Sequence, residues 1–186
     1  RLMAENLRSC GIDSNCAPLG DIAQADTHAV LKNRCYGSAL YAVVTHARAL
    51  HQGLRHGGVS GVLKHIPGHG RATLDSHLDL PRVPEDRSRL ERHDFEAFRQ
   101  LNMIEMGMTA HLVFEDIDPN HPATQSAAMI DIIRKDIGFA GLLMTDDISM
   151  EALSGPLDLR GQKALAAGVP CVAAISAPTS AAVDFA

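Results

Sequence analysis

The stretch VSGVLKHIPGHGRATLDSH, residues 59–77, joins a short apolar run to a segment crowded with titratable groups. Its second part, residues 64–77, holds three histidines, a lysine, an arginine and an aspartate within 14 residues. An apolar run that ends in polar side chains is typical of a buried parallel strand whose carboxyl end faces a ligand. The polar part is open to three interpretations: a metal site, an acid/base site for covalent chemistry, or a polar loop without chemistry.

The same pattern of a short apolar run with a polar end recurs along the chain. It predicts strands at residues 16–22, 59–65, 107–114, 141–146 and 169–175. Longer amphipathic segments between them predict helices at residues 2–9, 38–53, 84–103, 126–137 and 156–167. In the helix predicted at 84–103, for example, Leu90, Ala97, Phe98 and Leu101 share one face.

Alternating strands and helices indicate an α/β fold with a parallel sheet. Polar residues follow several of the strands, among them Asp21, His111 and Asp146. Both a (β/α)₈ TIM-type barrel and an open doubly wound sheet place ligands at that edge. With about five units instead of eight, the chain is interpreted as one partial barrel domain spanning residues 1–186, an interior piece of a barrel.

Composition excludes several classes of protein. The 186 residues are 46% hydrophobic and 21% charged, which is a globular composition, and the net charge of -5 favours neither nucleic acid nor an anionic membrane as a partner. The four cysteines form no CxxC pair, which favours free thiols in a reducing compartment. Residues 164–183 lack charge, but Pro170 and Pro178 interrupt them, so a buried strand with loops is favoured over a membrane span.

The metal interpretation rests on His65, His69 and His77. Pro67 and Gly68 lie between the first two, so these cannot share a helix face, and the sequence contains no HEXXH motif. We therefore expect no metal and no other cofactor. Nothing resembles a dinucleotide-binding glycine motif or a P-loop either.

The acid/base interpretation needs a second group elsewhere in the chain. The segment MTDDISM, residues 144–150, places Asp146 at the end of an apolar run. Asp75 and His77 lie two residues apart, and residues so spaced point to the same side of an extended segment. A carboxylate beside an imidazole fixes its tautomer and stabilises its charged form. For each motif alone, a turn or helix cap is the competing interpretation.

Taken together, these motifs resemble those of the bacterial β-N-acetylglucosaminidases (β-hexosaminidases) of glycoside hydrolase family 3. Residues 64–77 and MTDDISM carry most of the resemblance. NCAPLGDI at 15–22, NRCYG at 33–37, MTAHLVF at 108–114 and PATQS at 122–126 add to it in the same order. The resemblance implies a (β/α)₈ barrel that hydrolyses glycosides with retention through a covalent glycosyl-enzyme.

The resemblance also implies a role for each matching residue. Asp146 is expected to be the nucleophile and His77 the general acid/base, polarised by Asp75. The residues expected to bind sugar hydroxyls are Arg34, Lys64 and His65. His69 is expected to hold the loop, His111 is a candidate structural residue, and Asp21 and Asp147 are left between capping and support of the site.

The implied substrate is a terminal β-linked N-acetylglucosamine, as in cell-wall muropeptides recycled in the cytoplasm. The partner is thus a small carbohydrate, with no nucleic acid or membrane, and a monomer is favoured. Two alternatives stay open. One is a metal-dependent barrel hydrolase using His65, His69, His77 and Asp146. The other is a non-catalytic, sugar-binding barrel remnant, because the likeness fades after Ala167 and the first strands of a barrel are missing.

Overall fold

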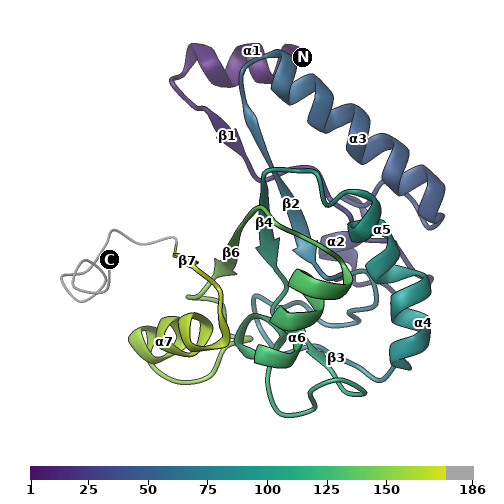
Figure 1. The fold of residues 1–186 in the computed structure, drawn as a ribbon, viewed down its shortest axis with the longest axis vertical. Coiled ribbons are helices and arrows are strands. Elements are labelled where there is room, and N and C mark those ends of the chain that lie inside the picture. Colours follow the sequence, from purple (N-terminus) through teal and green to yellow (C-terminus); the bar gives the residue numbers. More distant parts are fainter. Residues whose placement is uncertain (175–186) are drawn as a thin grey trace.

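A parallel sheet forms the centre of the computed structural model, which describes residues 1–174 (Figure 1). Its strands are β1 (Ser14–Asn15), β2 (Ser60–Ile66), β4 (Met106–Thr109), β6 (Leu142–Asp147) and β7 (Cys171–Ala173), in the order β1-β2-β4-β6-β7. Each neighbouring pair is parallel. The predicted α/β class with parallel strands is confirmed, and the carboxyl ends of the strands meet at one edge.

Helices connect the strands and cover the sheet (Figure 1). They are α1 (Leu2–Ser9), α2 (Ala29–Lys32), α3 (Leu40–His56), α4 (Arg87–Arg92), α5 (Asp94–Gln100), α6 (Ala127–Asp131) and α7 (Leu157–Ala167), with a 3₁₀ turn η1 (Ala123–Gln125) and a π-helical turn η2 (Ile132–Asp136). A second, two-stranded parallel sheet pairs β3 (Arg82–Val83) with β5 (Val113–Phe114). No helix within residues 1–174 is long and apolar enough to cross a membrane.

The main hydrophobic core lies between the sheet and the helices. Leu63 and Ile66 of β2 and Leu143 of β6 are fully buried in it, together with side chains from α3, α5 and η2. The four residues predicted to share one face of a helix (Leu90, Ala97, Phe98 and Leu101) are all fully buried here, as predicted. Burial of such apolar side chains contributes most of the favourable free energy of folding.

The strand predicted at 16–22 is wrong, because β1 is Ser14–Asn15 and ends before this range begins. The segment still runs beside β2: the carbonyls of Ala17 and Pro18 accept from the amides of Val62 and Lys64, and Leu19 forms an isolated parallel bridge with Lys64. Pro18 has no amide hydrogen to donate, which interrupts the ladder.

The single helix predicted at 84–103 is also wrong, since the chain forms α4 and α5 with a break at His93. His93 has φ −125° and ψ −73°, outside the helical region. The helix starts at Arg87 instead of Pro84, because Val83 belongs to β3 and Asp86, with φ −58° and ψ 136°, is still outside the helical region.

Two further strands differ from their predicted bounds. Residues 107–114 divide into β4 and β5, because the amide of Ala110 still bonds to Ile66 of β2 whereas Val113 pairs with Arg82 of β3. The last strand, β7, is Cys171–Ala173, and Ile175 of its predicted range lies outside the described residues. Gly138 ends the predicted helix at 126–137 with φ +73°, a conformation that glycine adopts readily.

Candidate active site

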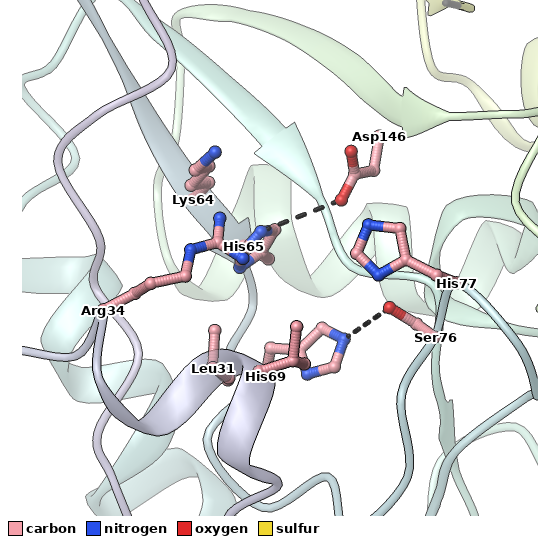
Figure 2. A pocket seen from close by; sticks show the side chains of 9 residues that line it. Leu31, Arg34, Lys64, His65, His69, Ser76, His77 and Asp146 are labelled. Atoms are coloured by element: carbon pink, nitrogen blue, oxygen red, sulfur yellow. Dashed lines mark hydrogen bonds and ion pairs between the residues drawn. The ribbon is translucent and has the colours of Figure 1, made fainter.

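A cavity of about 160 Å³ opens where the carboxyl ends of β2 and β6 meet. The residues that line it are Val30, Leu31, Arg34, Lys64, His65, His69, Ser76, His77 and Asp146 (Figure 2). They come from α2 and the short segment that follows it, from β2 and the loop after it, and from β6. Five of the six site residues predicted from the sequence thus meet at one cavity, and the sixth, Asp75, hydrogen-bonds to one of them.

His65, at the end of β2, is held from behind by the buried carboxylate of Asp21. Its Nδ1 lies 2.7 Å from Asp21 Oδ2, and the amides of His65 and His69 also donate to this carboxylate. Burial raises the pKa of Asp21, but the imidazoles of His65 and His69 and the hydrogen bonds to them outweigh it and lower the pKa below its ordinary value. The sequence did not decide between capping and support of the site for Asp21. In the structure Asp21 supports the site as a fixed negative charge.

Asp146 reaches the cavity from β6, opposite His65 (Figure 2). Its Oδ2 lies 3.7 Å from His65 Nε2, and its Oδ1 accepts from the amide of Asp147 at 2.8 Å. Burial raises the pKa of Asp146, yet His65, His111, the Asp147 amide and Lys64 together lower it below its usual value. Asp146 is therefore a carboxylate at neutral pH, and its side chain keeps 22% of its surface open to the cavity.

Asp75 and His77 form a second carboxylate–imidazole pair. Asp75 Oδ1 lies 2.7 Å from His77 Nδ1 and also accepts the backbone amide of His77 at 3.0 Å. These two bonds lower the pKa of Asp75. The segment is a turn, not an extended strand, since the amides of Leu78 and Asp79 donate to the carbonyl of Asp75. The pairing and the turn-capping interpretations therefore both hold for Asp75.

The loop that carries this pair is packed closely against the rest of the site. A side chain on Gly70 is impossible here, because its Cβ would lie 1.9 Å from the carbonyl oxygen of Ile22. His69 Nε2 lies 3.2 Å from Ser76 Oγ (Figure 2), and burial, aided by His65, lowers the pKa of His69 to about 4. His69 is thus a neutral imidazole that joins the two halves of the loop.

Arg71 ties the same loop to α4 and α5. Its guanidinium donates to Asp94 at 2.8 Å and to Glu85 at 2.7 Å, and Asp94 is almost completely buried. Arg89 also pairs with Glu85. Arginine suits this place because its rigid fork of donors engages two carboxylates at once.

Two cationic side chains, Lys64 and Arg34, approach the cavity from the side opposite His77 (Figure 2). Burial, and then the nearby Arg34, lower the pKa of Lys64. Both side chains are hydrogen-bond donors without acceptors, so they suit oxygen-rich ligands such as sugar hydroxyls.

His111 lies behind Asp146 and is almost completely buried. Its Nε2 donates to the carbonyl of Asp147 at 3.1 Å, and its Nδ1 lies 2.7 Å from Thr124 Oγ1. Burial is the main reason that its pKa is lowered. His111 therefore acts on the site through the backbone of the strand end that carries Asp146.

A metal site needs several donor side chains that converge on one point. Among residues 1–174, no group of three or more His, Cys, Asp or Glu side chains is placed to hold a metal ion. The metal-dependent alternative thus lacks a ligand cluster in the described part of the chain. Sequence reasoning missed Val30 and Leu31 as lining residues, because the four residues of α2 are too few for a periodic signal. It also missed Ser76, which lies between two residues that it did select.

Known proteins with similar sequences were found for most of this chain. The model of the family described as "Glycosyl hydrolase family 3 N terminal domain" matches residues 1–181. A beta-hexosaminidase of Alkalilimnicola ehrlichii is 40% identical over 92% of this chain and 50% of its own length. A beta-hexosaminidase of Nitrosomonas eutropha is 32% identical over 97% of this chain and 53% of its own.

Solved structures agree with these relatives. NagZ from Neisseria gonorrhoeae in complex with N-trifluoroacetyl-D-glucosamine is 35% identical, with a TM-score of 0.85 over 94% of this chain and 51% of that one. A glycosyl hydrolase of the same family from Mycobacterium smegmatis gives 0.88 at 30% identity, covering 98% of this chain and 58% of that one. The predicted fold class, an incomplete (β/α)₈ barrel, is confirmed. The chain spans about half the length of the curated relatives it matches.

Proposed function

Because the chain belongs to the family of glycosyl hydrolase family 3 N-terminal domains, we propose that it carries the catalytic machinery of a retaining β-N-acetylhexosaminidase. The observation that carries the proposal is the meeting of Asp146 and His77 at one cavity, reached from different segments of the chain. A carboxylate and an imidazole at one cavity are the two groups that this double displacement requires. We further propose that residues 1–186 act as one partial barrel domain.

In the first step, Asp146 attacks the anomeric carbon and His77 protonates the departing glycosidic oxygen. Asp146 suits the attack because it is ionised at neutral pH and is partly open to the cavity. The bond to the aglycone breaks, and a covalent glycosyl–Asp146 ester forms. Asp75 stabilises the imidazolium form of His77 that donates the proton.

In the second step, His77 takes a proton from water, which attacks the anomeric carbon and releases Asp146. The same imidazole thus acts as the acid in the first step and as the base in the second. His77 lies at the exposed side of the cavity, so water and the aglycone reach it. Two displacements on the same carbon retain the configuration.

The sugar is held by the opposite wall, where Lys64, Arg34 and His65 are proposed to bind hydroxyl groups. A relative was solved with N-trifluoroacetyl-D-glucosamine, which supports an N-acylated glucosamine as the glycone. We propose a terminal β-linked N-acetylglucosamine of cell-wall muropeptides as the substrate, and the cytoplasm as the compartment. These finer statements rest on the resemblance of the motifs.

Trapping the intermediate tests the proposal. The protein at its natural length is incubated with a fluorinated N-acetylglucosaminyl fluoride, digested, and mapped by mass spectrometry. The label is expected on the peptide that contains residues 142–147, at Asp146. A label on any other residue contradicts the mechanism. Binding of N-acetylglucosamine in calorimetry without hydrolysis of an aryl glycoside favours the alternative of a sugar-binding remnant.

A further inference from the structure

Two side chains organise the turn that follows the nucleophile strand. The Asp147 carboxylate accepts from the amide and the hydroxyl of Ser149, and Arg160 of α7 binds the carbonyls of the turn. Arg160 Nη1 donates to the carbonyls of Ile148, Ser149 and Met150 at 3.0, 3.1 and 3.0 Å, and its Nε donates to Gly155 at 2.8 Å. The side chain is only 12% exposed. Arg160 therefore fixes both the beginning and the end of the turn that starts directly after β6.

One peptide unit of this turn connects Arg160 to His77. The carbonyl of Met150 accepts from Arg160, and the amide of Glu151, in the same planar unit, donates to the carbonyl of His77 at 3.3 Å. In a trans peptide the carbonyl and the amide point in opposite directions. Holding the carbonyl on Arg160 therefore aims the amide at His77.

The next residue adds a second tie to the same loop. The amide of Ala152 donates to the carbonyl of Ser76 at 3.3 Å, and Ala152 is buried. Hydrogen bonds in series polarise one another, so the cation strengthens the bonds beyond it. Two backbone hydrogen bonds thus fasten the loop with the proposed acid/base to the turn.

From these contacts we infer that Arg160 is a positioning residue for His77. It holds the turn after β6 in the one orientation whose amides bind residues 76 and 77, and so sets the distance between His77 and the Asp146 strand. This inference deepens the proposed function and rests on it. Arg160 does not line the cavity, so it acts on the reaction through the backbone alone.

Arginine is required for geometric reasons. Four carbonyls converge on two of its nitrogens, and a planar guanidinium offers five donors that stay charged at every accessible pH. Lysine has one nitrogen on a flexible stem and cannot reach Gly155 and the three consecutive carbonyls with fixed directions. Arg160→Lys is therefore expected to give an intermediate effect.

Leaving-group dependence tests the inference. The constant kcat/KM is measured for the Arg160→Ala protein, at its natural length, with a dinitrophenyl and a phenyl β-N-acetylglucosaminide. The dinitrophenolate departs without protonation, whereas phenolate needs a well-placed acid. A displaced His77 should lower kcat/KM about 100-fold for the phenyl glycoside and less than about 3-fold for the dinitrophenyl glycoside.

Arg134→Ala is the matched control. Arg134 also donates to two backbone carbonyls, those of Phe139 and Gly141, but it does so at the opposite end of β6. Loss of Arg134 should reduce thermal stability while both substrates keep the same ratio of kcat/KM. A change of this ratio in Arg160→Ala but not in Arg134→Ala supports the inference.

The remaining outcomes are distinct. Equal losses on both substrates in a folded Arg160→Ala protein overturn the inference and leave the proposed function intact. Absence of hydrolysis by the unmodified protein overturns the proposed function itself. If Arg160→Ala fails to fold in a thermal melt, Arg160→Lys is measured instead; failure of both to fold makes Arg160 a stability residue and refutes the inference.

Discussion

Two carboxylate–imidazole pairs at the cavity share a 2.7 Å contact but have opposite surroundings. In the pair behind the cavity, Asp21 is 0% and His65 6% exposed. In the pair at its open side, Asp75 is 20% and His77 56% exposed. The carboxylate of Asp21 accepts hydrogen bonds from two backbone amides besides the imidazole. The carboxylate of Asp75 accepts from one backbone amide and lies on a turn.

The role of a carboxylate–imidazole pair therefore depends on its exposure and its other contacts, and not on its residue types. The buried pair has a fixed position, because its carboxylate accepts from an imidazole and two backbone amides, and this suits support of a nucleophile. An exposed pair exchanges protons with water and with a leaving group, which suits an acid/base.

The largest effect is expected from Asp146→Asn, which removes the group that both pairs flank. Because an amide is a poor nucleophile, kcat for an aryl β-N-acetylglucosaminide should fall by at least ~10⁴-fold in a steady-state assay. Asp158→Asn, on the exposed surface of α7, is the control and should keep full activity. Turnover of Asp146→Asn within 10-fold of normal, by rough standards for nucleophile loss, contradicts the assignment.

Breaking the buried pair with Asp21→Ala should cost stability first. The change leaves the amides of His65 and His69 without acceptors in the interior, so the free energy of unfolding should fall by about 3 to 5 kcal/mol. Urea denaturation measures it, with exposed Asp13→Ala as control. A loss below about 1 kcal/mol shows that the buried pair does not hold the site together.

Breaking the exposed pair with Asp75→Asn should reverse this balance. The pair is close to solvent, so the free energy of unfolding should change by at most about 1 kcal/mol. Activity on a phenyl glycoside should fall about 100-fold, because the imidazolium of His77 loses its counter-charge. Asp118 and His121 form a matched pair, 18% and 57% exposed and away from the cavity, so Asp118→Asn should retain activity. Equal activity losses in the two variants refute this role of Asp75.

A pH dependence of stability is expected to originate beside the buried pair, and it changes no catalytic group. The pKa of His69 falls from its ordinary 6.5 to about 4 on folding, so between these values the unfolded chain binds more protons. Stability should therefore decrease as the pH falls from about 7 to about 4, by on the order of 3 kcal/mol from this residue.

Denaturant titrations at pH 7 and pH 5 measure this decrease. His69→Gln lacks the titrating group and should lose less stability between the two pH values than the unmodified protein. His51 and His111, whose pKa values are also lowered chiefly by burial, account for part of what remains. The same loss in both proteins shows that His69 is not the source.

Sequence patterns predicted the repeated apolar runs that form strands and the polar residues at the ends of those strands. The apolar run before Lys64 and the one before Asp146 marked two strands whose ends meet, because parallel strands align their carboxyl ends. The break at His93 escaped prediction, since the apolar face of α4 continues into α5 without a proline or glycine. Patterns report which face is buried, not where the backbone turns.

Contacts between side chains and distant backbone could not be predicted. Arg160 binds carbonyls whose positions depend on how α7 packs, and no periodicity encodes that. Asp21 is 44 residues from His65, so their bond follows only from the parallel course of residues 17–20 along β2. The charged residues of the site were recognisable by type, whereas their supports were not.

The contact between Gly70 and Ile22 has a consequence for reading related genomes. Any residue larger than glycine there would push the loop away from Asp21 and carry His77 with it. A related protein that lost this glycine but kept the aspartate–serine–histidine triplet would still match a search for the triplet. Its histidine would nevertheless be displaced, and we expect such a protein to be inactive. The least reactive residue of the stretch is thus a sensitive marker of a working catalyst.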